Sequence, residues 1–124
     1  MDDLKLQRGS ATTVVLVLAV LMDGPRHGYD IAREVERRSG DTLSFKYATL
    51  YSVLHGLEAD GFIRSVWEQA QEERRARRVY NLTPEGAVAL EKACKQWVEF
   101  SQAVNSVIDA AGLLPTPKSD PLPT

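Results

Sequence analysis

The chain has 124 residues, of which 44% are hydrophobic and 26% charged, and its net charge is −2. This composition is typical of one soluble globular domain, and the near-neutral charge confines any nucleic-acid site to a local patch. The single cysteine excludes an intramolecular disulfide and, with only two histidines, leaves no four-ligand zinc site without carboxylates or a second chain. We expect a cytoplasmic protein without a metal or cofactor.

The first element is the apolar run VVLVLAVLM at residues 14–22. Nine residues are about half of what a bilayer span requires, and the acidic start of the chain does not fit a signal peptide. We therefore expect a buried element and no membrane partner. Its β-branched residues favour a strand, but no turn signal precedes it, and a helix over about residues 10–22 is equally compatible with the pattern.

A second helix is predicted over residues 28–38, because Ile31, Ala32 and Val35 recur at helical spacing between charged positions. Ser39 and Gly40 end it. We interpret His27, just before this helix, as a hydrogen-bonding residue that fixes the turn rather than as a metal ligand.

The most informative segment is YATLYSVLHGLEADGFI at residues 47–63, which holds the third helix, its stop and the start of a strand. Tyr47, Leu50, Leu54 and Leu57 lie on one helical face, with Val53 beside them. Ser44 is placed to cap its start, and Gly61 to end it in a left-handed conformation.

The opposite face of this helix carries small or hydrogen-bonding side chains with almost no charge: Ala48, Thr49, Tyr51, Ser52 and His55. A solvent-facing helix surface is normally rich in Lys and Glu. The uncharged face instead suits close approach to base edges in a DNA groove. Tyr51 packing on the second helix, and His55 as an ordinary surface residue, remain alternatives.

Two short segments of period two, residues 62–68 and 79–82, flank a polar, charged stretch and predict a β-hairpin. Its tip holds four arginines within five residues: Arg74, Arg75, Arg77 and Arg78. Such a patch fits the DNA backbone. The alternative is a solvated turn in which Glu72 and Glu73 pair with these arginines.

The last helix is predicted over residues 84–111, with Thr83 as N-cap and Gly112 as its end. A heptad seam runs along it: Ala87, Leu90, Cys94, Trp97, Ser101, Val104, Ile108 and Ala111. We expect a homodimer through Leu90, Cys94, Trp97, Ser101, Val104 and Ile108. Trp97 either packs in the dimer or forms a stacking wall for a planar aromatic effector. Buried packing explains Cys94 better than redox chemistry does.

This order predicts a mainly α fold with a two-stranded β-wing, which is a winged helix-turn-helix. We expect three parts: a DNA-binding domain at residues 1–82, a dimerisation helix at 83–112 and a disordered, proline-rich tail at 113–124.

Three segments resemble the PadR family of bacterial transcriptional regulators: LAVLMDGPRHGYDIAREVERRSG, YATLYSVLHGLEADGFI and RRARRVYNLTPEG. The resemblance covers roughly residues 15–108 and is closest to the subfamily with one short C-terminal helix. It implies a homodimeric winged-helix repressor, often released from its operator by a small aromatic or cationic effector. The chain departs from the family pattern at Ala48, Ser52 and Gly56, and Gly56 replaces a basic residue that could contact phosphate.

We therefore predict a sequence-specific transcriptional regulator that binds double-stranded DNA. The candidate DNA contacts are Ser44, Lys46, Tyr47, Thr49, Tyr51, His55, Arg74, Arg75, Arg77 and Arg78. The alternative is an interaction adaptor that dimerises without binding DNA, which the near-neutral charge would favour. No phosphate-binding loop, GxSxG or HExxH motif is present in the sequence, so we do not expect an enzyme.

Overall fold

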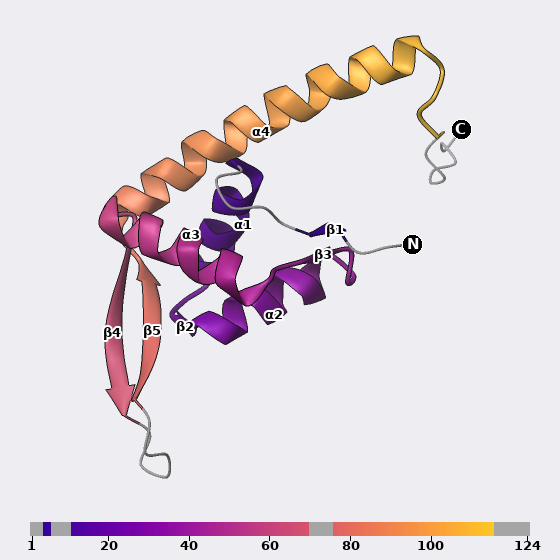
Figure 1. Cartoon of the computed structure of the whole chain (residues 1–124). Coiled ribbons are helices and arrows are strands. Elements are labelled where there is room, and N and C mark those ends of the chain that lie inside the picture. Colours follow the sequence, from indigo (N-terminus) through magenta and orange to yellow (C-terminus); the bar gives the residue numbers. More distant parts are fainter. Residues whose placement is uncertain (1–3, 6–10, 70–75, 116–124) are drawn as a thin grey trace, which may run out of the picture. The chain divides into compact units, whose positions relative to one another are not determined.

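The computed structural model describes residues 4–5, 11–69 and 76–115 (Figure 1). The elements in chain order are β1 (Leu4–Lys5), α1 (Ala11–Leu21), β2 (Arg26–His27), α2 (Gly28–Arg38), β3 (Leu43–Ser44), α3 (Tyr47–Ala59), β4 (Ile63–Gln69), β5 (Ala76–Leu82) and α4 (Pro84–Ala110). The chain divides into two compact units, Met1–Cys94 and Lys95–Thr124, and α4 begins in the first and ends in the second. Arg74, Arg75 and residues 116–124 of the predicted tail lie outside the described residues.

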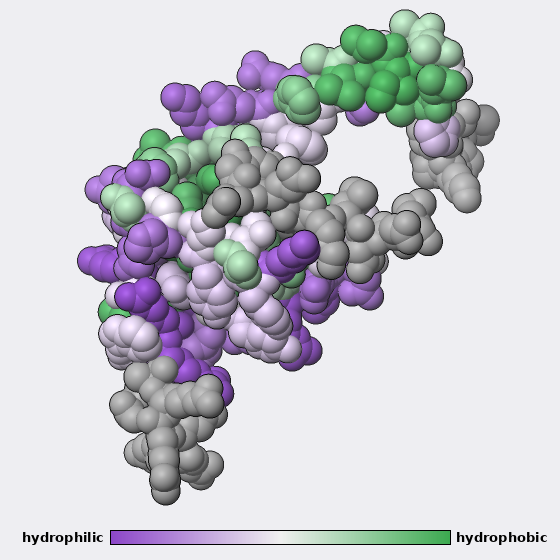
Figure 2. Space-filling model, in the orientation of Figure 1, coloured by the Kyte–Doolittle hydropathy of each residue, from purple (hydrophilic) through white to green (hydrophobic). Residues whose placement is uncertain are grey.

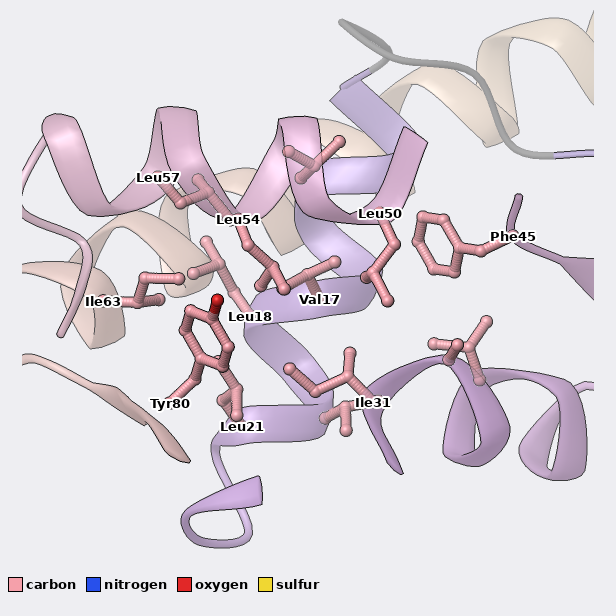
Figure 3. Close-up of a cluster of buried hydrophobic side chains, with 14 of the residues drawn as sticks. Val17, Leu18, Leu21, Ile31, Phe45, Leu50, Leu54, Leu57, Ile63 and Tyr80 are labelled. Atoms are coloured by element: carbon pink, nitrogen blue, oxygen red, sulfur yellow. The ribbon is translucent and has the colours of Figure 1, made fainter. Parts of the chain in front are cut away.

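The apolar run near the start of the chain forms a helix, α1, and not a strand. Val17 and Leu18 are fully buried, and so is Thr13. A helix satisfies its own backbone hydrogen bonds, so it can cross the middle of a small core without strand partners. Figure 3 shows α1 passing between α3, α2 and the sheet.

The core is built where the predicted inner face of α3 meets α1, α2 and the sheet. Leu50 and Leu54 are fully buried, as are Ile31 from α2 and Leu18 from α1 (Figure 3). Ile63 and Tyr80 close the cluster from the sheet side. Burying each large aliphatic side chain contributes about 1.5–3 kcal/mol relative to leaving it exposed, so this cluster fixes the position of α3.

The end of α3 follows the predicted glycine stop in detail. Gly61 has φ +82°, and its N–H donates to the carbonyl of Glu58 at 3.0 Å while that of Phe62 donates to Leu57 at 3.0 Å. These two bonds are the Schellman arrangement, which only a left-handed residue allows. The chain can therefore turn directly from α3 into β4.

The start of α3 corrects one prediction. The N-cap position is Lys46, without a side-chain capping bond, so Ser44 does not cap the helix. Ser44 lies instead in β3, which pairs in parallel with β1. Its side chain is buried, and its hydroxyl has no hydrogen-bond partner among the described residues. Ser44 is therefore also removed from the candidate DNA contacts.

The sheet has three strands, in the order β2-β5-β4, and not the two that were predicted. β4 and β5 pair antiparallel from Ile63↔Leu82 to Gln69↔Ala76 and project away from α1, α2 and α3 (Figure 1). We call residues 63–82 the wing. The added strand, β2, pairs Arg26 and His27 with the inner end of β5, which joins the turn before α2 to the base of the wing.

α4 starts and stops as its sequence predicts, one residue shorter at its end. The Thr83 hydroxyl accepts a hydrogen bond from the N–H of Gly86 at 3.0 Å, which is a standard N-cap contact. Gly112, with φ +75°, terminates the helix. Leu90 is nearly buried in the core of the first unit, so the structure places it in the domain and not in an exposed dimer seam.

Candidate nucleic-acid interface

The outer face of α3 is exposed and almost free of charge. Lys46, Ala48 and His55 are exposed, while Thr49 and Ser52 are half-buried. The carboxylate near the end of the helix, Glu58, is turned toward β4, where it accepts hydrogen bonds from the Ser65 hydroxyl at 2.6 Å and its N–H at 3.1 Å. The Glu58 carboxylate is therefore turned away from the polar groups and from the cation of this face, Lys46. A polar face of this kind suits contact with bases.

Tyr51 lies against the N-terminus of α2 and is still 46% exposed. A Cβ atom built on Gly28 would lie 2.8 Å from the Tyr51 hydroxyl oxygen and 2.9 Å from its ring. The absence of a side chain at Gly28 thus lets Tyr51 pack on α2. This packing was one of the two interpretations of Tyr51 from the sequence. The exposed half of the ring and the hydroxyl remain at the surface.

Tyr47 was predicted on the inward face with Leu50, but it is 54% exposed. Its ring stacks on Tyr29 of α2, with centroids 5.8 Å apart and planes 29° apart. Partial burial and the hydroxyl of Tyr29 raise the pKa of Tyr47 above its ordinary value. At the first position of the helix, a side chain can lie outside the core even though its spacing matches the inner face.

The wing presents a cation on an aromatic side chain. Trp67 and Arg78 face each other across β4 and β5, and the guanidinium carbon lies 4.9 Å from the Trp67 ring centroid. Trp67 is 65% exposed, and Arg77 is exposed on the neighbouring position. Stacking of this kind holds an arginine in place.

His27 links the turn before α2 to the wing. Its Nε2 lies 3.2 Å from Glu68 Oε1, and its Nδ1 lies 3.5 Å from Asp30 Oδ2. These contacts agree with the interpretation of His27 as a residue that fixes the turn. The same contacts border an open pocket of about 440 Å³ lined by His27, Gly28, Tyr29, Asp30, Tyr51, Trp67, Arg77 and Arg78. The structure thus brings the predicted residues Tyr51, Arg77 and Arg78 to one surface.

Two other arginines, on α2, are held by a carboxylate. Glu34 accepts hydrogen bonds from Arg37 at 2.5 and 3.0 Å and from Arg38 at 2.6 Å, and Arg38 also contacts Asp23. The Arg37 and Arg38 hydrogen bonds lower the pKa of Glu34 to about 2. These two cations are neutralised locally and are poor candidates for DNA contacts.

In the second unit, α4 exposes a wide apolar face that includes Trp97, Phe100, Val104 and Val107. Figure 2 shows hydrophobic residues gathered over the C-terminal half of this helix. The Trp97 and Phe100 rings lie 6.1 Å apart. Ser101 and Ile108, also on the predicted seam, are half-buried, and Cys94 is exposed in the single chain. Exposed apolar side chains that cluster on one face are a feature of protein–protein interaction surfaces.

Within the described ranges, no three His, Cys, Asp or Glu side chains are placed to hold a metal ion. Nor does any helix of these ranges have the length and apolarity needed to cross a membrane.

Sequence reasoning did not single out Tyr29, Arg33 or Trp67 as members of the interface. The sequence signal for Tyr29 and Arg33 was an aromatic residue and an arginine one helical turn apart. Trp67 and Arg78 become partners only through the cross-strand register of β4 and β5.

The fold and this surface together define a winged helix-turn-helix protein. The sequence pattern of the Transcriptional regulator PadR-like family matches residues 17–92, and the chain belongs to that family. It is 38% identical over 82 residues to the transcriptional regulator Rv3488 of Mycobacterium tuberculosis, covering 66% of this chain and 72% of that protein.

Solved structures are similar over most of the chain. A transcriptional regulator from Clostridium thermocellum has a TM-score of 0.72 at 27% identity, covering 77% of this chain and 92% of its own. A PadR family transcription regulator from Clostridium difficile R20291 has a TM-score of 0.67 at 29% identity, covering 77% and 97%. The resemblance noted in the sequence is therefore confirmed, and the chain is a transcriptional regulator of this family.

Proposed function

We propose that the protein is a dimeric, sequence-specific repressor that inserts α3 into the major groove of its operator. The observation that carries the proposal is the outer face of α3, which is exposed, polar and nearly uncharged beside an arginine-bearing wing. Thr49 and His55 would contact base edges or a thymine methyl group, and Lys46 a phosphate at the helix N-terminus. Family membership supports the regulatory role.

The wing would supply most of the charge. Arg78, held on Trp67, and Arg77 would contact the sugar–phosphate backbone, together with Arg74 and Arg75, which precede β5 in the sequence. Each neutralised phosphate adds about −0.9 to the slope of log K against log salt. A near-neutral chain with Gly56 in the last turn of α3 needs such a local source of cations.

The apolar face of α4 would pair with a second copy through Trp97, Ser101, Val104 and Ile108, with Cys94 at its edge. A two-fold dimer would offer two recognition helices to half-sites about one helical turn apart on a near-palindromic operator.

The test begins with duplexes that the protein selects from a random library, titrated at several salt concentrations beside a scrambled duplex. We expect the selected duplex to bind more tightly by at least about 10³-fold. Equal affinity for both duplexes would contradict sequence-specific binding, and no binding to either duplex would favour the adaptor without DNA binding. Replacing Arg77 and Arg78 with Ala should flatten the salt slope by about 2, whereas Lys92→Ala, an exposed change on α4, should leave it unchanged.

Release by an effector forms a second part of the proposal, and the exposed Trp97–Phe100 pair supports it. Two such pairs across a dimer axis would make a stacking site for a planar aromatic compound. Tryptophan fluorescence during titration with planar aromatic cations measures binding, and Trp97→Phe separates this response from that of Trp67. A response that persists in the variant would remove Trp97 from the site.

A further inference from the structure

Two residues of α2 form a stack with Tyr47, the first residue of α3. Tyr29 and Arg33 are one helical turn apart, so their side chains lie on the same face of α2. The Arg33 guanidinium carbon lies 5.6 Å from the Tyr29 ring centroid. The ring of Tyr47 also stacks on Tyr29, with ring centroids 5.8 Å apart. The stack therefore runs from α2 to the first residue of α3.

The members of this stack face solvent. Tyr29 is 48% and Tyr47 54% exposed, and Arg33 is also exposed. Exposed aromatic rings that contact each other keep a fixed geometry at little cost in side-chain entropy, because each has only two rotatable bonds. The stack is thus a continuous part of the surface, and Lys46 directly precedes it in the chain.

Arg33 differs from Arg37 and Arg38 on α2 in having no carboxylate partner within the described part of the chain. Glu34 engages Arg37 and Arg38, whereas Arg33 forms no ion pair with any carboxylate of the described residues. Arg33 lines an open hollow of about 470 Å³ together with Asp30 and Glu36. Neither of these carboxylates lies within ion-pair distance of Arg33. Stacked on Tyr29, the guanidinium keeps its donor edge available for an anion.

We propose that Tyr29 and Arg33 extend the DNA interface from α3 onto α2, with Arg33 bound to a backbone phosphate and Tyr29 as its support. This inference rests on the proposed DNA-binding function and assigns a contact to the first helix of the helix-turn-helix. A guanidinium suits a phosphate because it can donate two parallel hydrogen bonds. The Tyr29–Tyr47 contact would also hold the start of α3 at a fixed distance from that phosphate.

A charge contact and its support have different signatures in a salt titration. Loss of one phosphate contact lowers the slope of log K against log salt by about 1, and affinity near physiological salt by about tenfold. Loss of the supporting ring lowers affinity by leaving the arginine less ordered, but keeps the number of released counterions nearly unchanged.

The experiment uses the full chain and a mixed-sequence duplex of about three helical turns, because phosphate contacts do not depend on sequence. Arg33→Ala should reduce the slope by about 1 and weaken binding about tenfold. The matched control is Arg37→Ala, which removes the same charge from the same helix at a cation already held by Glu34, and it should leave the slope within about 0.3 of the parent. Arg33→Lys should restore the slope but not the full affinity.

Tyr29→Leu should weaken binding several-fold at an unchanged slope, and Tyr29→Phe, which keeps the ring, should bind like the parent. Thermal unfolding of each variant shows that the fold is retained. Equal effects of Arg33→Ala and Arg37→Ala would overturn the proposal, because the contribution would then come from total charge. So would a parental slope for Arg33→Ala. If the parent protein itself failed to bind any duplex, the proposed function would fall together with this inference.

Discussion

The hydroxyl of Thr83 donates a hydrogen bond to the carbonyl oxygen of Gly61 at 2.7 Å. The same hydroxyl accepts from the N–H of Gly86, and the N–H of Thr83 donates to the carbonyl of Phe62 at 3.1 Å. One residue thus caps the start of α4 and binds the turn that ends α3. The end of α3 is therefore fixed to the beginning of α4 through Thr83.

Replacing Thr83 with Ala should lower the free energy of unfolding by about 1–2 kcal/mol, because both the N-cap and the bond to Gly61 are lost. Chemical denaturation monitored by circular dichroism measures the change. Thr83→Ser keeps the hydroxyl and should cost less than about 0.5 kcal/mol. Equal losses in the two variants would show that the methyl group, and not the hydroxyl, stabilises this junction.

Replacing either of two helical glycines, Gly56 and Gly86, with alanine should change the free energy of unfolding, and in opposite directions. A Cβ atom at Gly86 would lie 2.0 Å from the carbonyl oxygen of Phe62, whereas one at Gly56 would meet nothing within 4 Å. Gly86→Ala must displace the backbone and should destabilise the domain by about 2 kcal/mol or more. Gly56→Ala should stabilise it by about 0.5–1 kcal/mol. Unfolding curves of the two variants beside the parent test both signs, and a stable Gly86→Ala protein would contradict the close approach.

Acid should weaken the α2 ion-pair cluster within a defined range. The pKa of Glu34 is lowered from 4.5 to about 2, first by hydrogen bonds from Arg37 and Arg38. The folded state therefore favours the ionised carboxylate, and its contribution is present above about pH 4.5 and is lost as the pH falls toward 2. Glu34→Gln should be less stable than the parent at pH 7, with the difference shrinking below pH 4.5. A difference that stays constant across this range would exclude the carboxylate as its source.

Sequence patterns predicted the features that depend only on residues close together in the chain. Residues 28–38, the Gly61 stop and the Thr83 cap follow from periodicity and capping chemistry, which are local. The patterns did not predict β2, because two residues show no period and their strand is defined only by its partner, β5. They also misplaced two residues. Ser44 was predicted to cap α3 but is buried in β3, and Leu90 was predicted in the dimer seam but is buried in the core of the first unit.

The candidate site shows the same division. The face of α3 could be read from spacing, but the Arg33–Tyr29–Tyr47 stack and the Trp67–Arg78 pair join residues from different elements. Gly28 illustrates why: its lack of a side chain matters only because Tyr51, 23 positions later, lies against it. Contacts of this kind depend on tertiary packing, which helical or strand periodicity does not encode.

The apolar face of α4 gives a direct test of self-association. Val104 is 38% exposed on this face, between the positions of Trp97 and Ile108 on the predicted seam. Val104→Asp would place a carboxylate, and its symmetry mate, in an apolar interface, where an unpaired charge costs several kcal/mol. We expect the dimer to weaken by at least about 100-fold, as measured by sedimentation equilibrium.

The matched control for Val104→Asp is Gln102→Asp, which adds the same charge to an exposed polar position two residues away. Residues two apart on a helix do not share a face, so this variant should associate like the parent. DNA binding adds a second readout, because a dimer that contacts two half-sites loses most of its affinity when it dissociates. If Val104→Asp associated as tightly as Gln102→Asp, the apolar face would have to be covered by something other than a second copy of this chain.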